Sequence, residues 1–68
     1  MPSEYRGWRI CHPILNEEPV GVWWANGQIE HVATGELEAV ALRDHFRARD
    51  DALNAYVLAA RRRIASKQ

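Results

Sequence analysis

Residues 20–33 have the sequence VGVWWANGQIEHVA, in which Asn26-Gly27 separates two segments of strand-forming residues. A type I′ turn needs positive φ at both central residues, and Asn-Gly adopts that conformation at little cost. We therefore expect a β-hairpin at this point, with strands at 19–25 and 28–34.

The two-residue turn also decides which side chains share a face, because it sets the pairing register of the two strands. It places Trp24 opposite Ile29 on the core side of the sheet and leaves Trp23 pointing outward. A first strand at 5–14 completes a three-stranded antiparallel β-meander. Four of its residues share one side of the sheet, namely Trp8, Ile10, His12 and Ile14.

The rest of the chain has the composition of a helix. All Gly, Pro and Trp residues precede residue 36, and Thr34 is the expected N-cap of a helix over 35–66. Strand-forming residues followed by helix-forming residues indicate an α+β domain, and the length of 68 residues indicates a single domain over 1–68.

Six apolar side chains of the expected helix share one stripe at 100° per residue, namely Leu42, Phe46, Leu53, Val57, Ala60 and Ile64. Charged residues at 47–51 interrupt this stripe, and Asp50 or Asp51 is a candidate cap for a second helix. One long, bent helix and a helical hairpin are therefore the two alternatives. The long helix would outrun a three-stranded sheet, so we expect a homodimer whose interface uses Phe46, Leu53, Val57 and Ile64. A monomer would favour the hairpin.

The size and the cysteine content support self-association. A core of this size rarely contributes more than about 3–5 kcal/mol of net stability without additional support. Cys11 is the single cysteine, which excludes an intrachain disulfide. The first five residues contain neither a basic nor an apolar segment, and no apolar run approaches the roughly 18 residues of a membrane span. We expect a soluble protein of the reducing cytoplasm.

The residues that could carry chemistry are too scattered to form a site. Cys11, His12 and His31 are candidate metal ligands, but structural zinc needs four ligands, usually paired at short spacing. We interpret Cys11 as a small strand residue and His31 as a core-edge histidine with a hydrogen-bond partner. Adjacent carboxylates, as in Glu17-Glu18 and Asp50-Asp51, point in different directions and do not converge. We expect no enzymatic activity, no metal and no cofactor.

The outward Trp23 is the main candidate for partner binding, because Trp and Arg are enriched at interface hot spots. If the first two strands pair, Arg9 or Arg6 lies beside it, and Glu30 lies on the same face. These residues predict a small protein-protein interaction module. Its expected role is that of a homodimeric regulator or inhibitor, by analogy with accessory proteins of phages and mobile elements.

A nucleic-acid-binding protein is the alternative. Seven of the nine basic residues lie from Arg43 onward, including Arg61, Arg62 and Arg63 near the C-terminus. These arginines could contact phosphates, but they also suit the last turns of a helix, where cations complement the helix dipole. The net charge of zero disfavours the nucleic-acid alternative, because nucleic-acid-binding domains usually carry a basic excess.

Overall fold

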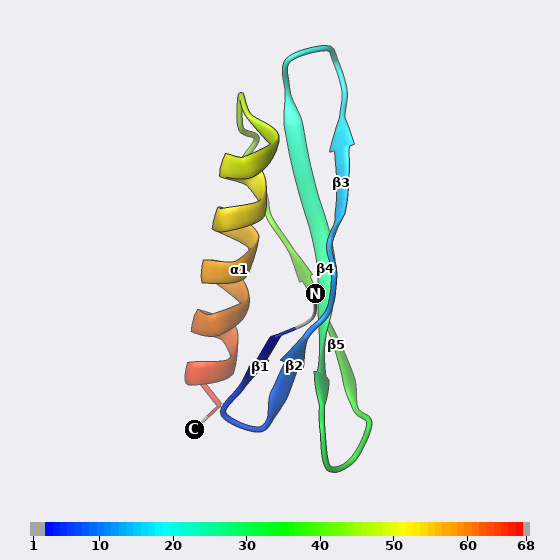
Figure 1. Ribbon diagram of the computed structural model, residues 1–68, viewed down its shortest axis with the longest axis vertical. Helices are drawn as coiled ribbons and strands as arrows, with labels where there is room; N and C mark the ends of the chain where they lie inside the picture. The colour runs from blue at the N-terminus through cyan, green and yellow to red at the C-terminus, as the bar shows by residue number, and fades with distance from the viewer. Residues whose placement is uncertain (1–2, 68) are drawn as a thin grey trace.

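The computed structural model describes residues 3–67, which form an antiparallel five-stranded sheet with one helix on one of its faces (Figure 1). In chain order the elements are β1 (Ser3–Tyr5), β2 (Trp8–Ile10), β3 (Ile14–Glu17), β4 (Trp23–His31), β5 (Leu37–Ala41) and α1 (Arg49–Ala65). The strand order is β1-β2-β4-β3, and β5 pairs with β4 along its remaining edge. The predicted α+β class is confirmed, although the sheet has five strands instead of three.

The central strand β4 runs straight through Asn26-Gly27. Neither residue has positive φ, and both pair with residues of β5, so the predicted hairpin is wrong. The predicted strands at 19–25 and 28–34 are parts of one strand. Across a two-residue turn, residues 25 and 28 would share a face, but in a continuous strand they lie on opposite faces. The predicted faces of the residues before the supposed turn are therefore inverted.

The two-residue turn of the sheet lies at Arg6-Gly7 instead. Both residues have positive φ, 51° and 86°, and they connect the paired residues Tyr5 and Trp8. This geometry matches a type I′ turn, whose twist suits the flanking strands. The predicted strand at 5–14 is therefore divided among β1, β2 and β3.

A β-bulge separates β2 from β3, which lie end to end along β4. Ile10 pairs with Ile29, and Ile14 pairs with Asn26. The chain therefore advances four residues from Ile10 to Ile14 while β4 advances only three. One extra residue within 11–13 reverses the facing of the residues after it. Ile14 consequently lies on the face opposite Ile10, in contrast to the prediction.

Residues 37–41, predicted to be helical, form the edge strand β5. Thr34, the predicted N-cap, lies in the β4–β5 turn, where its hydroxyl accepts a hydrogen bond from the Glu36 N–H at 3.3 Å. The same short side chain that caps helices can also close a turn in this way. Gly35 has a φ of 78°, and its N–H donates to the carbonyl of His31, which completes the turn.

The helix α1 begins at Arg49, where the sequence suggested an interruption. Asp50 and Asp51 lie in its first turn, where negative charge complements the helix dipole. Neither the 35–66 helix nor the helical hairpin is formed. No helix within residues 3–67 combines the length and the apolar character that a transmembrane segment needs.

The core lies between α1 and one face of the sheet. The sheet contributes Trp8, Ile10, Ala25, Ile29 and Val40, and α1 contributes Ala52, Tyr56, Ala60 and Ile64. The alanines at 52 and 60 flank Tyr56 at intervals of four residues, so they lie on its face of the helix. Small residues on either side of a large ring allow the helix to approach the sheet closely.

Candidate protein-binding surface

The sheet face opposite α1, here called the open face, is not covered by any described element (Figure 1). Strand alternation places on it Arg9, Ile14, Trp24, Gln28, Glu30 and Leu37, together with the small residues Ala39 and Ala41. Ile14 and Leu37 are 72% and 57% exposed. The open face therefore offers apolar contact area in a continuous sheet.

A cross-strand ion pair crosses the middle of the open face. Arg9 and Glu30 are directly opposite in the β2–β4 pairing, and the Arg9 Nη1 atom lies 3.0 Å from Glu30 Oε1. Both side chains are partly exposed, so the pair contributes only about 0–1 kcal/mol to stability. Its main effect is to neutralise the charge of this region.

Trp24 lies at one end of the open face and connects two loops. Its indole Nε1–H donates to the Glu18 carbonyl at 2.8 Å, and its ring centroid lies 5.6 Å from that of His45. The tryptophan is thereby held in place while part of its ring remains accessible. Such an anchored aromatic side chain loses little conformational entropy when a partner binds.

A hollow of about 290 Å³ adjoins the exposed Ile14. Its lining includes His12, Asn26 and Gln28, and part of its floor is the backbone of Gly27. Because Ile14, Asn26 and Gln28 belong to the open face, the hollow opens on the same side as the apolar residues. A side chain of a partner could enter it.

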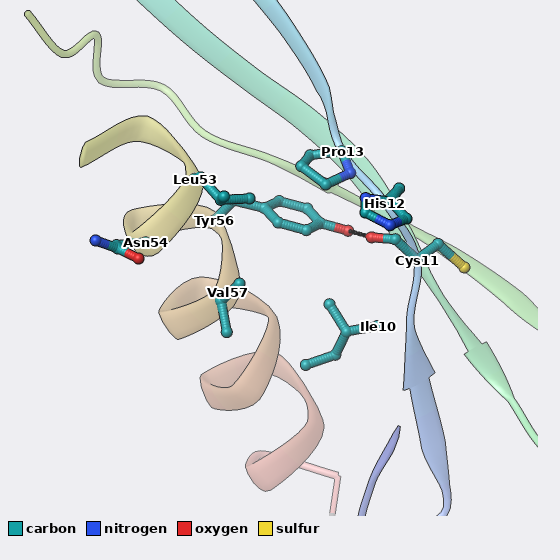
Figure 2. A pocket seen from close by; sticks show the side chains of 8 residues that line it. All are labelled: Ile10, Cys11, His12, Pro13, Leu53, Asn54, Tyr56 and Val57. Atoms are coloured by element: carbon teal, nitrogen blue, oxygen red, sulfur yellow. Dashed lines mark hydrogen bonds between the residues drawn. The ribbon is translucent and has the colours of Figure 1, made fainter. Parts of the chain in front are cut away.

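The other pocket lies between α1 and the bulge, and Tyr56 forms part of its wall (Figure 2). The Tyr56 hydroxyl donates to the Cys11 carbonyl at 2.8 Å and lies 3.1 Å from the Gln28 carbonyl. Burial raises the pKa of Tyr56, because the ionised phenolate would be poorly solvated there. The tyrosine thus hydrogen-bonds the backbone at the bulge and of the facing strand β4 and ties α1 to the sheet, which is a structural role.

This second pocket has a volume of about 220 Å³. Leu53 and Val57 form its helical wall, and Cys11 and His12 lie on the bulge. Figure 2 shows the Cys11 sulfur pointing away from the Tyr56 hydroxyl. Within residues 3–67, no three His, Cys, Asp or Glu side chains gather as a metal site would require.

His31 has the hydrogen-bond partner that the sequence suggested. Its Nδ1 accepts a hydrogen bond from the Thr34 N–H at 3.3 Å, and its ring packs edge-on against Trp8 with centroids 4.9 Å apart. This part of the prediction is confirmed. Trp8 is opposite His31 in the β2–β4 pairing, and Thr34 lies in the β4–β5 turn just after His31.

No family model, curated protein or solved structure matches this chain.

The four residues predicted to bind a partner do not form one patch. Arg9 and Glu30 meet on the open face, but Trp23 lies on the helix side, where it packs against the core. The Trp23 backbone N–H donates to the Phe46 carbonyl at 2.6 Å. This bridge continues the pairing along β4 past the end of β5. Arg6 lies in the β1–β2 turn with its guanidinium 5.3 Å from the Tyr5 ring centroid.

The predicted dimer residues are largely used within the chain. Ile64 is completely buried in the core, so it cannot contact a second chain directly. Leu53 and Val57 are half-buried and line the pocket beside the bulge, while Phe46 is half-buried next to Trp23. The helical stripe is thus an intramolecular contact, whereas the homodimer itself stays a prediction.

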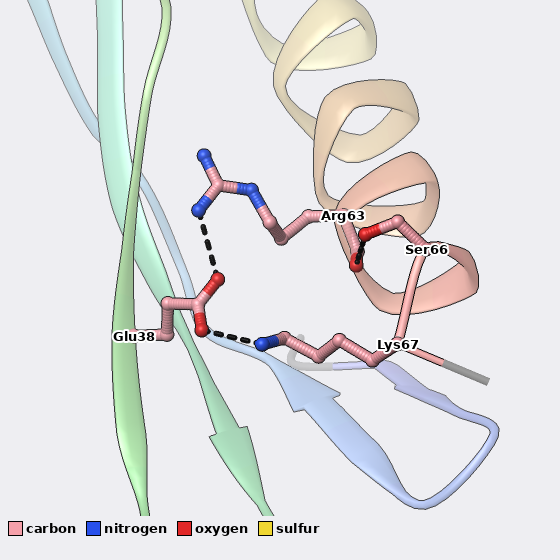
Figure 3. A network of polar contacts seen from close by, with 4 residues as sticks. All are labelled: Glu38, Arg63, Ser66 and Lys67. Atoms are coloured by element: carbon pink, nitrogen blue, oxygen red, sulfur yellow. Dashed lines mark hydrogen bonds and ion pairs between the residues drawn. The ribbon is translucent and has the colours of Figure 1, made fainter.

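The predicted basic patch is mostly engaged with neighbouring residues. Arg63 and Lys67 both contact the Glu38 carboxylate, with N–O distances of 2.8 and 2.6 Å (Figure 3). Arg61 lies 5.8 Å from the Tyr5 ring centroid. Arg62 is exposed and has no ion pair within the described part of the chain. The three arginines therefore do not form one free cationic surface.

Sequence reasoning missed Trp24, Ile14 and Leu37 as surface residues and Tyr56 as the residue that contacts the bulge. The signal for Tyr56 was present, because Ala52, Tyr56, Ala60 and Ile64 follow one another at four-residue intervals. The signal for Ile14 was Pro13, which cannot donate a ladder hydrogen bond and often marks a bulge.

Proposed function

We propose that this protein is a small non-catalytic module that binds another protein through the open face and thereby regulates or inhibits it. The observation that supports this proposal is the exposure of Ile14 and Leu37 on a sheet face that α1 leaves uncovered. Large apolar side chains exposed on an uncovered sheet face can mark an interaction surface. We further propose that it acts in the cytoplasm, where the single thiol of Cys11 would stay reduced.

The open face has the composition of an interface between soluble proteins. Apolar residues and neutral polar residues such as Gln28 alternate across it, and the Arg9–Glu30 pair carries no net charge. Interfaces of this type combine apolar contacts with hydrogen bonds at the rim. A partner with a flat, mostly neutral surface and a side chain that fits the hollow beside Ile14 would suit it.

A nucleic acid would suit the same surface poorly. Arg9 is paired with Glu30, so this pair has no net charge. Arg63 and Lys67 share the single carboxylate of Glu38, which leaves one net positive charge at that site. Binding to phosphates would require these cations to leave their partners. Salt separates the alternatives, since phosphate binding weakens steeply between about 50 and 200 mM salt, whereas an apolar protein interface changes little.

The test compares two exposed apolar residues on opposite sides of the molecule. Ile14→Asp places a charge on the open face, and Leu58→Asp places one on the outer side of α1, where Leu58 is 50% exposed. Proteins captured from the source cells by the immobilised parent protein would be purified and titrated against both variants. We expect Ile14→Asp to weaken binding by at least about tenfold, because a charge in an apolar contact must be desolvated.

The proposal predicts that Leu58→Asp binds like the parent and that the affinity depends little on salt. Equal binding by Ile14→Asp and the parent would contradict the assignment to the open face. A captured nucleic acid with a steep salt dependence would instead support the alternative function.

A further inference from the structure

The free edge of β5 has the pattern of a strand that can pair with another strand. The His31 N–H donates to the Glu36 carbonyl, and the Leu42 N–H donates to the Ala25 carbonyl. Because backbone groups alternate in direction along a strand, the groups of residues 36, 38, 40 and 42 face β4. Those of Leu37, Ala39 and Ala41 point away from the sheet, where no described strand pairs with them.

The other sheet edges carry features that limit such pairing. The β3 edge lies between Pro13 and Pro19 and carries the acidic Glu17, and β1 is three residues long. Proline, charge and short length are the usual protection of edge strands. The β5 segment has no proline.

The side chains of β5 leave its edge open. Its one charged residue, Glu38, turns toward Arg63 and Lys67 on the helix side of the sheet (Figure 3). The residues whose backbone groups point outward have apolar side chains that lie on the open face, and Leu37 among them is 57% exposed. This edge is therefore apolar and lacks both proline and an outward-facing charge.

We propose that β5 pairs antiparallel with β5 of a second copy of the chain and so forms a two-fold symmetric dimer with one continuous sheet. Centring the two-fold axis on Ala39 places Ala39 opposite Ala39 and Leu37 opposite Ala41. Every outward backbone group then has a partner, which gives about six hydrogen bonds between the chains. Centring the axis on Glu38 or Val40 would leave some of these groups unpaired.

The charges at the two ends of β5 favour the antiparallel arrangement. Glu36 precedes the strand and Arg43 follows it, and both are exposed. Antiparallel pairing with the axis on Ala39 places Glu36 of one copy opposite Leu42 of the other, and thus one residue away from Arg43, at both ends of the interface. Parallel pairing would place like charges side by side, so the strand is complementary to itself in one direction only.

The two-fold axis would run through the sheet, so both helices would lie on one side and both open faces on the other. A dimer of this kind doubles the proposed binding surface without covering it. The inference does not depend on the proposed function, because the pairing uses the edge of the sheet and not the hollow beside Ile14.

Light scattering after size exclusion at increasing concentration tests the proposal. We expect the mass to rise toward twice the 7.8 kDa of one chain. Ala39→Lys places two lysines face to face at the axis and should weaken the dimer by at least about tenfold. Asn16→Lys adds the same charge on β3 and should leave the mass unchanged. Circular dichroism would verify that both variants are folded.

A charge exchange tests the register. Arg43→Glu should weaken the dimer by roughly threefold or more, because the Glu36 carboxylate then lies near a second negative charge at both ends of the interface. The double variant Glu36→Arg with Arg43→Glu should restore the parent affinity. A mass of one chain at every concentration would overturn the proposal, as would a dimer that Ala39→Lys leaves intact. Ile14→Asp should still form the dimer, so failure of this proposal is distinct from failure of the proposed function.

Discussion

At the scale of single residues, Gly27 and Tyr56 decide how the helix contacts the sheet. A Cβ atom on Gly27 would lie 2.6 Å from the Cε1 and Cζ atoms of Tyr56 and would also meet its hydroxyl oxygen. No real Cβ contact is this short, so the absence of a side chain is what admits the ring. The ring in turn brings its hydroxyl to the Cys11 carbonyl at the bulge. The glycine serves close packing here and not a turn.

We therefore expect Gly27→Ala to lower the free energy of unfolding by about 1–3 kcal/mol, the usual cost of overpacking a core. Urea unfolding followed by tryptophan fluorescence would measure it. Asn26→Ala, at the neighbouring exposed position, should change stability by less than about 0.5 kcal/mol. In a Tyr56→Ala background the glycine substitution should cost less, since the ring is absent. An equal cost in both backgrounds would contradict the explanation.

At the scale of elements, residues 37–41 show how tertiary contacts override helix propensity. The segment contains Leu, Glu and Ala, which favour helices in isolation, yet it forms a strand along β4. The strand buries Val40 beneath α1 and orients Glu38 toward Arg63. It also satisfies backbone groups along an edge of β4 that would otherwise be unpaired. These gains outweigh differences in propensity of a few tenths of a kcal/mol per residue.

The start of α1 offers a direct way to stabilise the protein. Ala48 has the extended backbone of an N-cap, with φ −131° and ψ 144°, but its side chain cannot accept a hydrogen bond from the first turn. We expect Ala48→Ser to raise the free energy of unfolding by about 1 kcal/mol. Urea unfolding would measure the change, and Arg47→Ser, one residue before the cap, should have little effect. A neutral or destabilising effect of Ala48→Ser would indicate that the helix begins elsewhere.

At the scale of the whole molecule, the ion pairs of Glu38 join the C-terminal end of α1 to the edge strand β5. Lys67 and Arg63 both hydrogen-bond its carboxylate, and they lower the pKa of Glu38 below its ordinary value of 4.5. Arg63 belongs to α1, and Lys67 follows it closely, so two cations near one helix end hold one strand residue. Together with the Tyr56 hydrogen bonds at the bulge, these ion pairs link the helix to the sheet through polar contacts.

The lowered pKa determines how the stability should depend on pH. A carboxyl group whose pKa is lower in the folded state stabilises the fold above its unfolded pKa and loses that contribution as the pH falls through the folded pKa. Glu38→Gln should therefore be less stable than the parent at neutral pH, and the difference should disappear under acidic conditions below about pH 4. Thermal unfolding at a series of pH values would measure this. Glu18→Gln is the matched control, because Glu18 is exposed and has no ion pair within residues 3–67, and it should show no such pH-dependent difference.

The sequence alone determined the composition of the two halves and hence the α+β class. Glycine, proline and tryptophan before residue 36 indicated strands, and their absence afterwards indicated a helix. It also placed Arg9 and Glu30 at the surface and gave His31 a hydrogen-bond partner, because local alternation and chemistry suffice for such assignments. For the candidate surface, the two charged residues were therefore predictable, whereas Trp24 and Ile14 were not.

The tertiary structure decided where the strands bend and where they continue. In isolation Asn26-Gly27 favours a tight turn, but Tyr56 of the distant helix α1 selects the continuous strand, because its ring occupies the space beside Gly27. The same choice moves Trp23 to the core and Trp24 to the open face, while the bulge at 11–13 moves Ile14 outward. Local sequence could not reveal these outcomes, because the packing energy that favours them arises only when α1 lies on the sheet.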